Sequence, residues 1–153
     1  AAEEKQNFHR QLNLALQYKK SQLIQPFIEY LHFLMSGVNK LPDVKGTVWR
    51  GAKREIIHGV NYQKDAVVDW CGVTSTTLDQ AKAHQYCGGK GDKGLVFQVE
   101  VKHGKFIQPF SMFPNEQEVL LSPLTKLIVT QPLHLQGPHN YINLTESQGS
   151  WSF

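Results

Sequence analysis

Several features that would define a function class are scarce or missing from this 153-residue chain. No apolar run approaches the roughly 18 residues that a membrane-spanning helix needs, so we expect no membrane span. Cys71 and Cys87 are too few for a disulfide framework; they form one bridge or, as we favour, two buried thiols. The 16 basic residues show no run with interleaved aromatics, so we expect no nucleic-acid partner.

Known catalytic and ligand-binding motifs are also lacking. Gly89 and Gly94 have the spacing of a phosphate-binding loop, but Leu95 stands where that loop requires lysine. There is no GxSxG, HExxH or CxxC pair, and His84 with Cys87 is too little for a metal site. The first residues do not have the basic and then apolar order of a signal peptide, which gives a small preference for the cytoplasm over secretion.

What is present suits a single globular domain. The chain is 41% hydrophobic and 19% charged, and we predict one domain over residues 1–153, acting as a monomer. Residues 1–40 are expected to be helical, because apolar side chains recur there at three- and four-residue steps. The clearest such series is Ile24, Phe27, Ile28, Leu31, Leu34, Met35 and Val38.

Short strands are predicted in the remaining part, residues 46–153. The clearest is 95–101, where apolar residues alternate with Gln98 and Glu100 as in a half-buried strand. Thr77 and Gln80 have the spacing of a capping box, which predicts a helix that begins there and ends near Tyr86. Further strands are expected at 47–50, at 67–76 with an interruption at Gly72, and at 119–121, 127–130 and 141–144. Helices followed by short strands indicate an α+β fold.

Three segments carry polar groups of chemical interest: Val48-Trp49-Arg50-Gly51, Val73-Thr74-Ser75-Thr76-Thr77 and Phe113-Pro114-Asn115-Glu116-Gln117-Glu118-Val119-Leu120-Leu121. Each alone has a plain interpretation, as a surface charge, a helix cap and a solvated turn. In an extended chain, however, Glu116 and Glu118 project to the same side. Two like charges there are unfavourable unless a cation lies beside them, and a cationic substrate would supply it.

The order of these segments resembles the arginine-serine-glutamate class of mono-ADP-ribosyltransferases, which includes vertebrate ecto-enzymes and the enzymatic components of clostridial binary toxins. The similarity extends over residues 46–130 and is greatest to the eukaryotic arginine-specific branch. It implies an α+β, ADP-ribosyltransferase-like fold, with N-terminal helices packed on two small, mainly antiparallel sheets. NAD would lie in a cleft between the sheets, and no metal would be needed.

The resemblance also implies a role for particular residues. The residues implied to bind NAD are Arg50, Gly51, Ser75, Thr76, Thr77, Tyr86 and Glu118; those implied to contact the acceptor are Phe113 and Glu116. Arg50 would bind the diphosphate, and Gly51 would let the backbone approach the nicotinamide. Ser75 would hold the ribose and orient Glu118, the catalytic carboxylate. Glu116, Ser75 and Arg50 complete the implied catalytic set.

The acceptor implied by Glu116 is arginine, since relatives that modify asparagine or guanine have glutamine there. The predicted function is therefore transfer of ADP-ribose from NAD to an arginine of a protein, with release of nicotinamide. Two alternatives keep the same site: an NAD glycohydrolase, and a non-enzymatic NAD-binding module. A third is an unrelated α+β interaction domain.

Overall fold

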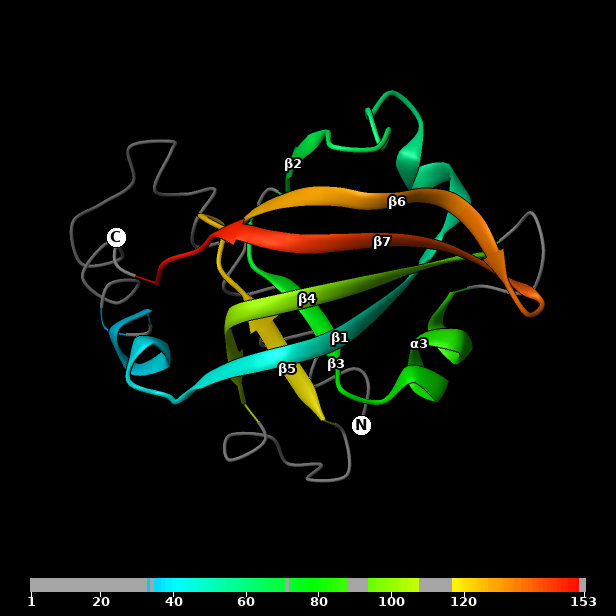
Figure 1. Cartoon of the computed structure of the whole chain (residues 1–153). Coiled ribbons are helices and arrows are strands. Elements are labelled where there is room, and N and C mark those ends of the chain that lie inside the picture. Colours follow the sequence, from blue (N-terminus) through cyan, green and yellow to red (C-terminus); the bar gives the residue numbers. More distant parts are fainter. Residues whose placement is uncertain (1–32, 34, 71, 88–93, 108–116, 152–153) are drawn as a thin grey trace, which may run out of the picture.

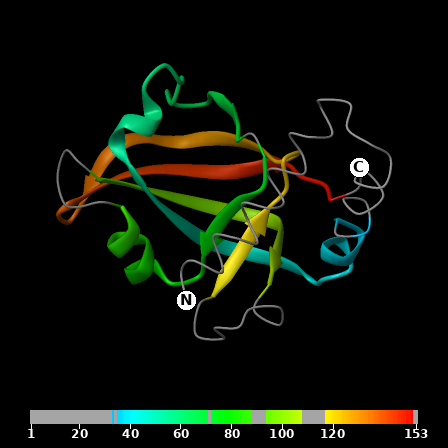
Figure 2. The same ribbon diagram turned by 180° about the vertical axis from the view of Figure 1, so that it is seen from behind.

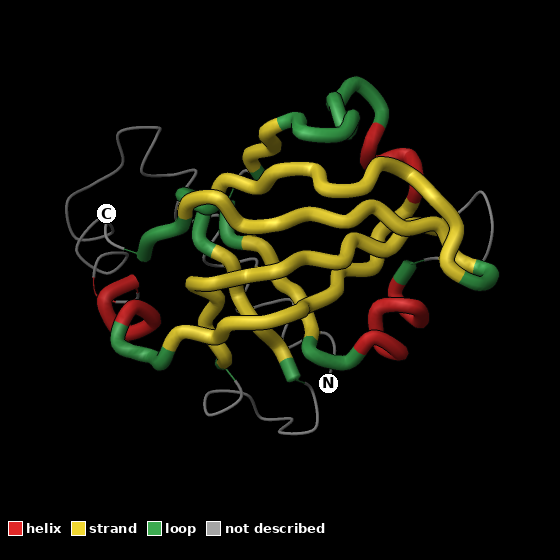
Figure 3. The backbone as a smooth tube through the Cα atoms, viewed as in Figure 1, coloured by secondary structure: helices red, strands yellow, loops and turns green. Residues whose placement is uncertain are grey.

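The structure, a computed structural model, describes residues 33, 35–70, 72–87, 94–107 and 117–151 (Figure 1). Residues 35–39 are helical, and the elements after them are coloured by type in Figure 3. They are β1 (Asp43–Lys53), η1 (Arg54–Ile57), β2 (Val67–Asp69), β3 (Thr74–Thr77), α3 (Gln80–Tyr86), β4 (Gly94–Phe106), β5 (Glu118–Leu121), β6 (Lys126–Gln136) and β7 (His139–Gln148). Among the described residues, no helix is long and apolar enough to cross a membrane.

The strands form one hydrogen-bonded sheet in the order β1-β3-β5-β4-β7-β6-β2, and β1 also pairs with β4 along its length. The connection to β3 and β5 is narrow. β5 pairs with β4 only at Lys105 and Phe106, and β3 pairs with β1 only at Trp49. Seen from either side, β3 and β5 cross the direction of the long strands steeply (Figures 1 and 2). The prediction of two small sheets is therefore corrected to one continuous sheet with a strongly turned β3–β5 part.

The predicted N-terminal helices are not borne out, because the described part of the chain is mostly β-sheet. Residues 1–32 and 34 of that prediction lie outside the described residues. The helical residues 35–39 do bury Met35 and Val38, as the apolar spacing predicts. These two side chains pack with Leu120 of β5 and with Trp151 near the end of the chain.

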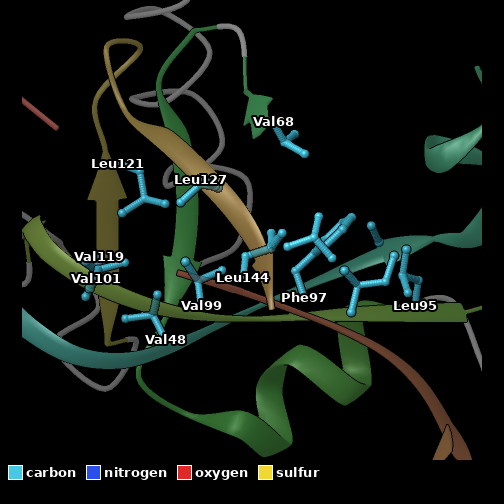
Figure 4. Close-up of a cluster of buried hydrophobic side chains, with 13 residues drawn as sticks. Val48, Val68, Leu95, Phe97, Val99, Val101, Val119, Leu121, Leu127 and Leu144 are labelled. Carbon is cyan, nitrogen blue, oxygen red and sulfur yellow. The ribbon is translucent and has the colours of Figure 1, made fainter. Parts of the chain in front are cut away.

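The main core lies between the long strands and β5. Its buried side chains are Val48, Ala52, Val68, Leu95, Phe97, Val99, Val101, Val119, Leu121, Leu127, Val129, Ile142 and Leu144. Figure 4 shows Val119 and Leu121 of β5 among the side chains of β4 and β6. The alternation of apolar residues that predicted β4 thus gives its core face, as expected for a period of two.

The opposite face of β1, β4 and β7 is covered by α3. Ala83 and Cys87 pack there on Val96 and Tyr141, with Trp49 beside them. Val96 is fully buried, so β4 is covered on both faces where a half-buried strand was predicted. The Cys87 thiol donates to the carbonyl of His84 at 3.1 Å, while Cys71 lies outside the described residues.

Helix α3 confirms the predicted helix, but its cap differs from the prediction. Asp79 is the N-cap, and its side chain accepts a hydrogen bond from the backbone of Ala81 at 3.0 Å. Thr77 instead accepts from the backbone of Asp79 at 3.0 Å, two residues earlier. Gly72 has a φ of 77°, a backbone conformation that favours glycine, and it divides the predicted strand 67–76 into β2 and β3.

Candidate active site

Ser75 and Glu118 lie on neighbouring antiparallel strands. The register pairs Ser75 with Leu120 and Thr77 with Glu118, so all four side chains share one face of the β3–β5 pair. Ser75 and Glu118 are diagonal neighbours on that face, and the Ser75 hydroxyl donates a hydrogen bond to Oε2 of Glu118. The structure therefore brings together two of the residues that the sequence placed in one site.

Glu118 is held firmly in a buried position. It is 3% exposed, and its backbone carbonyl accepts from the amide of Ile107 at 3.2 Å. The preceding carbonyl, of Gln117, accepts from the amide of Leu78 at 2.9 Å. The strand is thus anchored on both sides at the carboxylate, which fixes where its charge lies. A buried carboxylate held by a donor is a group whose charge is little screened by water.

Leu120 of β5, two residues after Glu118, is opposite a lysine that is anchored to the N-terminal part of the described chain. Lys105 is buried, and its ammonium group donates to the carbonyls of Asn39 at 3.2 Å and Leu41 at 2.6 Å. It also pairs with Asp43 at 2.7 Å, and the pKa of Asp43 is lowered mainly by this hydrogen bond. Because Lys105 stands opposite Leu120 in the ladder, this contact ties the helical residues 35–39 to the strand that carries the carboxylate.

Thr76 points to the other face of β3. Its hydroxyl donates to the backbone carbonyl of Val119 at 2.7 Å, and its side chain is 3% exposed. This orientation does not support the direct NAD contact implied for Thr76. The hydroxyl holds β3 on β5, whereas the two neighbours Ser75 and Thr77 share the face of Glu118.

Sequence reasoning missed Trp49. It pairs with Thr77, which in turn pairs with Glu118, so the three residues form one row across β1, β3 and β5. Its indole Nε1 donates to Gln98 at 3.2 Å and its ring packs beside α3. The sequence could have indicated this position, because neighbouring residues of a strand project to opposite faces and Trp49 is next to Arg50.

Arg50 lies on the opposite face of β1 from that row, together with Val48 and Ala52. Its guanidinium lies over the ring of Trp70, 5.3 Å from the centroid. The side chain is half-buried, and burial lowers its pKa from the usual value. Among the residues that the structure describes, Arg50 has no carboxylate partner. The predicted grouping of Arg50 directly with Ser75 and Glu118 is thus not seen, although the three strands are adjacent.

Gly51 has a packing role that the resemblance did not imply. A Cβ at this position would lie 2.8 Å from the amide nitrogen of Cys87, and it would also collide with the carbonyl of Ala83. Glycine is therefore required for α3 to approach β1. Tyr86, at the last position of α3, is 51% exposed.

The sequence pattern of the family described as NAD:arginine ADP-ribosyltransferase matches residues 2–152. The chain belongs to this family.

Similarity to one curated relative of the family extends over much of the chain. Vis, a protein of Vibrio splendidus (strain 12B01) named as an NAD(+)–arginine ADP-ribosyltransferase, is 27% identical over 129 residues. The match covers 80% of this chain and 51% of Vis, so the chain spans about half the length of this relative.

Solved structures of ADP-ribosyltransferases show the same fold. Vis in complex with agmatine has a TM-score of 0.61 at 24% identity, covering 80% of this chain and 59% of that chain. Exoenzyme S from Pseudomonas aeruginosa, in complex with a human 14-3-3 protein and bound to carba-NAD, has a TM-score of 0.64 at 19% identity. That match covers 92% of this chain and 68% of the other. The chain therefore has the ADP-ribosyltransferase fold.

Two acceptor residues predicted from the family likeness, Phe113 and Glu116, lie outside the described residues. The described part of β5 begins just after them, at Glu118. Among the described residues, no group of three histidine, cysteine, aspartate or glutamate side chains could hold a metal ion.

Proposed function

We propose that this chain transfers ADP-ribose from NAD to an arginine guanidinium of an acceptor protein and releases nicotinamide. The observation that carries the proposal is the buried carboxylate of Glu118 fixed by the hydroxyl of Ser75, in a chain of the NAD:arginine ADP-ribosyltransferase family. The agmatine complex of Vis and the carba-NAD complex of Exoenzyme S support an arginine-like acceptor and an NAD donor for this chain as well.

Glu118 acts on the bond between nicotinamide and ribose. As this bond breaks, positive charge develops on the ribose in an oxocarbenium-like transition state. A carboxylate that is already fixed and desolvated stabilises this charge without having to reorganise. Ser75 keeps Glu118 in place and holds the ribose hydroxyls, and Thr77 lies beside them on the same face.

Arg50 binds the diphosphate of NAD. A half-buried guanidinium without a carboxylate partner in the described chain is suited to an anionic ligand, and its planar fork matches phosphate oxygens. β3 leaves β1 after the single pairing at Trp49, so from Arg50 onward that edge of β1 has no strand beside it in the described part. Since neighbouring strands lie about 4.8 Å apart, β1 is about 10 Å from β5. A dinucleotide that lies along this edge would reach both Arg50 and Glu118.

The remaining residues contact the nicotinamide of NAD and the arginine that accepts ADP-ribose. Tyr86 packs its ring against the nicotinamide, whose carboxamide approaches the backbone of Gly51. Glu116 receives the substrate guanidinium and helps to remove its proton, with Phe113 as an aromatic contact on the same segment. No step in this chemistry needs a metal, so transfer should persist in a chelator.

The test is incubation of the protein with NAD and agmatine. We expect an ADP-ribosyl-agmatine adduct by mass spectrometry, with nicotinamide released in equal amount. Glu116→Gln should lose the adduct and still release nicotinamide, because only the acceptor contact is removed. Free ADP-ribose with no adduct from the wild-type protein would reject transfer in favour of NAD glycohydrolase activity.

A further inference from the structure

The guanidinium of Arg50 rests on an aromatic cluster formed by Tyr62, Trp70 and Phe97. These residues come from three separate places in the chain: the segment before β2, the residue directly after β2, and the first part of β4. Phe97 stands opposite Arg50 in the β1–β4 ladder, so both side chains share a face. The Trp70 ring meets Phe97 edge-on, with centroids 5.0 Å apart, and also faces the guanidinium.

Each ring of the cluster is fixed by another. The indole Nε1 of Trp70 donates to the hydroxyl of Tyr62 at 3.1 Å, and the Tyr62 ring tilts against Phe97 at 5.5 Å. Phe97 is itself fully buried in the main core. The ring that faces Arg50 is therefore held by packing against Phe97 and by a hydrogen bond to Tyr62.

The aromatic cluster gives the cation a partner that makes no demand on its N–H groups. A carboxylate at this position would occupy the guanidinium fork and neutralise its charge. The face of an indole ring attracts the cation through its quadrupole and leaves the five donors directed outward in the plane. Burial against these rings also removes water from the guanidinium, which strengthens its attraction for an anion.

We propose that Trp70, supported by Tyr62 and Phe97, is a positioning residue that holds Arg50 ready for the diphosphate of NAD. This inference rests on the proposed function for the identity of the ligand. It adds a residue outside the three family segments, and it makes the contribution of Trp70 to NAD binding act through Arg50.

A double-mutant cycle on binding of carba-NAD, an analogue in which a carbocycle replaces the ribose ring that bears nicotinamide, tests this coupling. Trp70→Leu should raise the dissociation constant about tenfold, the effect expected for loss of a desolvated cation–π contact, and Trp70→Phe only about twofold to threefold. In an Arg50→Gln background, where the cation is gone, the same substitutions should change the dissociation constant less than twofold.

Trp151→Leu is the matched control. This tryptophan is buried, whereas Trp70 is partly buried; it donates to the carbonyl of His103 and packs with Met35 and Val38, in a different cluster from the one that Trp70 packs against. Its effect should be the same in both backgrounds. Thermal melting identifies folded variants, and Trp70→Phe keeps the ring packing if Trp70→Leu does not fold.

Equal effects of the Trp70 substitutions in the two backgrounds would overturn the positioning role. They would leave ADP-ribosyl transfer untouched, because the agmatine assay measures it independently. If the effects of the Trp70 substitutions depend on Arg50 but the protein forms no agmatine adduct, the positioning role is retained and the transferase activity is rejected. A wild-type protein that does not bind carba-NAD would reject both.

Discussion

Arg50 on β1 and Glu118 on β5 are both charges removed from water, yet the fold holds them in different ways. Glu118 is 3% exposed and is fixed by a hydroxyl and by backbone hydrogen bonds of its own strand. Arg50 is half-buried against rings that take none of its donors. The carboxylate is thus held at one defined point, whereas the guanidinium keeps its hydrogen-bonding capacity for a ligand. This difference suits Glu118 to act on the bond that breaks and Arg50 to bind NAD.

The largest expected effect tests the role of Glu118 on β5. Glu118→Gln keeps the shape and an acceptor for the Ser75 hydroxyl but removes the charge. We expect kcat for nicotinamide release to fall on the order of 10²-fold or more, because electrostatic stabilisation of the transition state is lost. Binding of carba-NAD, measured by calorimetry, should stay within about twofold, as the ground state carries little charge at that carbon.

Glu146→Gln is the control for this prediction. Glu146 is also 3% exposed and accepts from the amides of Lys102 and His103, but on β7. Its replacement should lower thermal stability and leave kcat within about twofold, since Glu146 lies neither on β5 with Glu118 nor on β1 with Arg50. An equal fall of kcat in the two variants would mean that the loss at Glu118 reflects the fold and not the chemistry.

The second prediction concerns α3, which packs on β1 at Gly51. Gly51→Ala places a Cβ against backbone atoms of Ala83 and Cys87, which cannot move without shifting α3. We expect the free energy of unfolding to fall by about 1–3 kcal/mol or more, as for overpacking of a close contact. The KM for NAD should rise with little change in kcat in the folded fraction, because α3 carries Tyr86.

Gly46→Ala shows how much of this effect belongs to glycine in β1 in general. Gly46 is in the same strand, and a Cβ there would meet no atom within 4 Å, although its φ of 137° makes alanine strained. We expect this variant to lose stability through backbone strain but to keep its KM for NAD. If both variants raised the KM equally, the close approach of α3 would not be the cause.

The sequence predicted features that depend on local pattern. The alternation in β4 and the helix ending at Tyr86 follow from side-chain periodicity and were correct. The closeness of Ser75 and Glu118 followed only from the family likeness, because 43 residues separate them. The aromatic cluster under Arg50 could not be predicted, since Tyr62 and Trp70 meet Phe97 only through tertiary packing, and Arg50 joins them through the pairing of β1 with β4. The cap of α3 was wrong for a different reason: Asp79 and Thr77 both suit a cap, but Thr77 is the last residue of β3 and pairs with Glu118, so Asp79 caps the helix.

The smallest expected effect separates stability from chemistry within β3 itself. Thr76 and Ser75 are consecutive hydroxyl residues of β3, and both donate to β5: the Thr76 hydroxyl to the backbone carbonyl of Val119, and the Ser75 hydroxyl to the carboxylate of Glu118. Thr76→Val keeps the volume and removes the donor to the carbonyl of Val119, which should cost about 1 kcal/mol in the free energy of unfolding. Chemical denaturation measures this loss, and kcat and KM for NAD should stay unchanged because the side chain faces the core. A fall in kcat beyond about threefold in Thr76→Val, with β3 still folded, would show that both faces of the strand contribute to catalysis, and not the face of Ser75 alone.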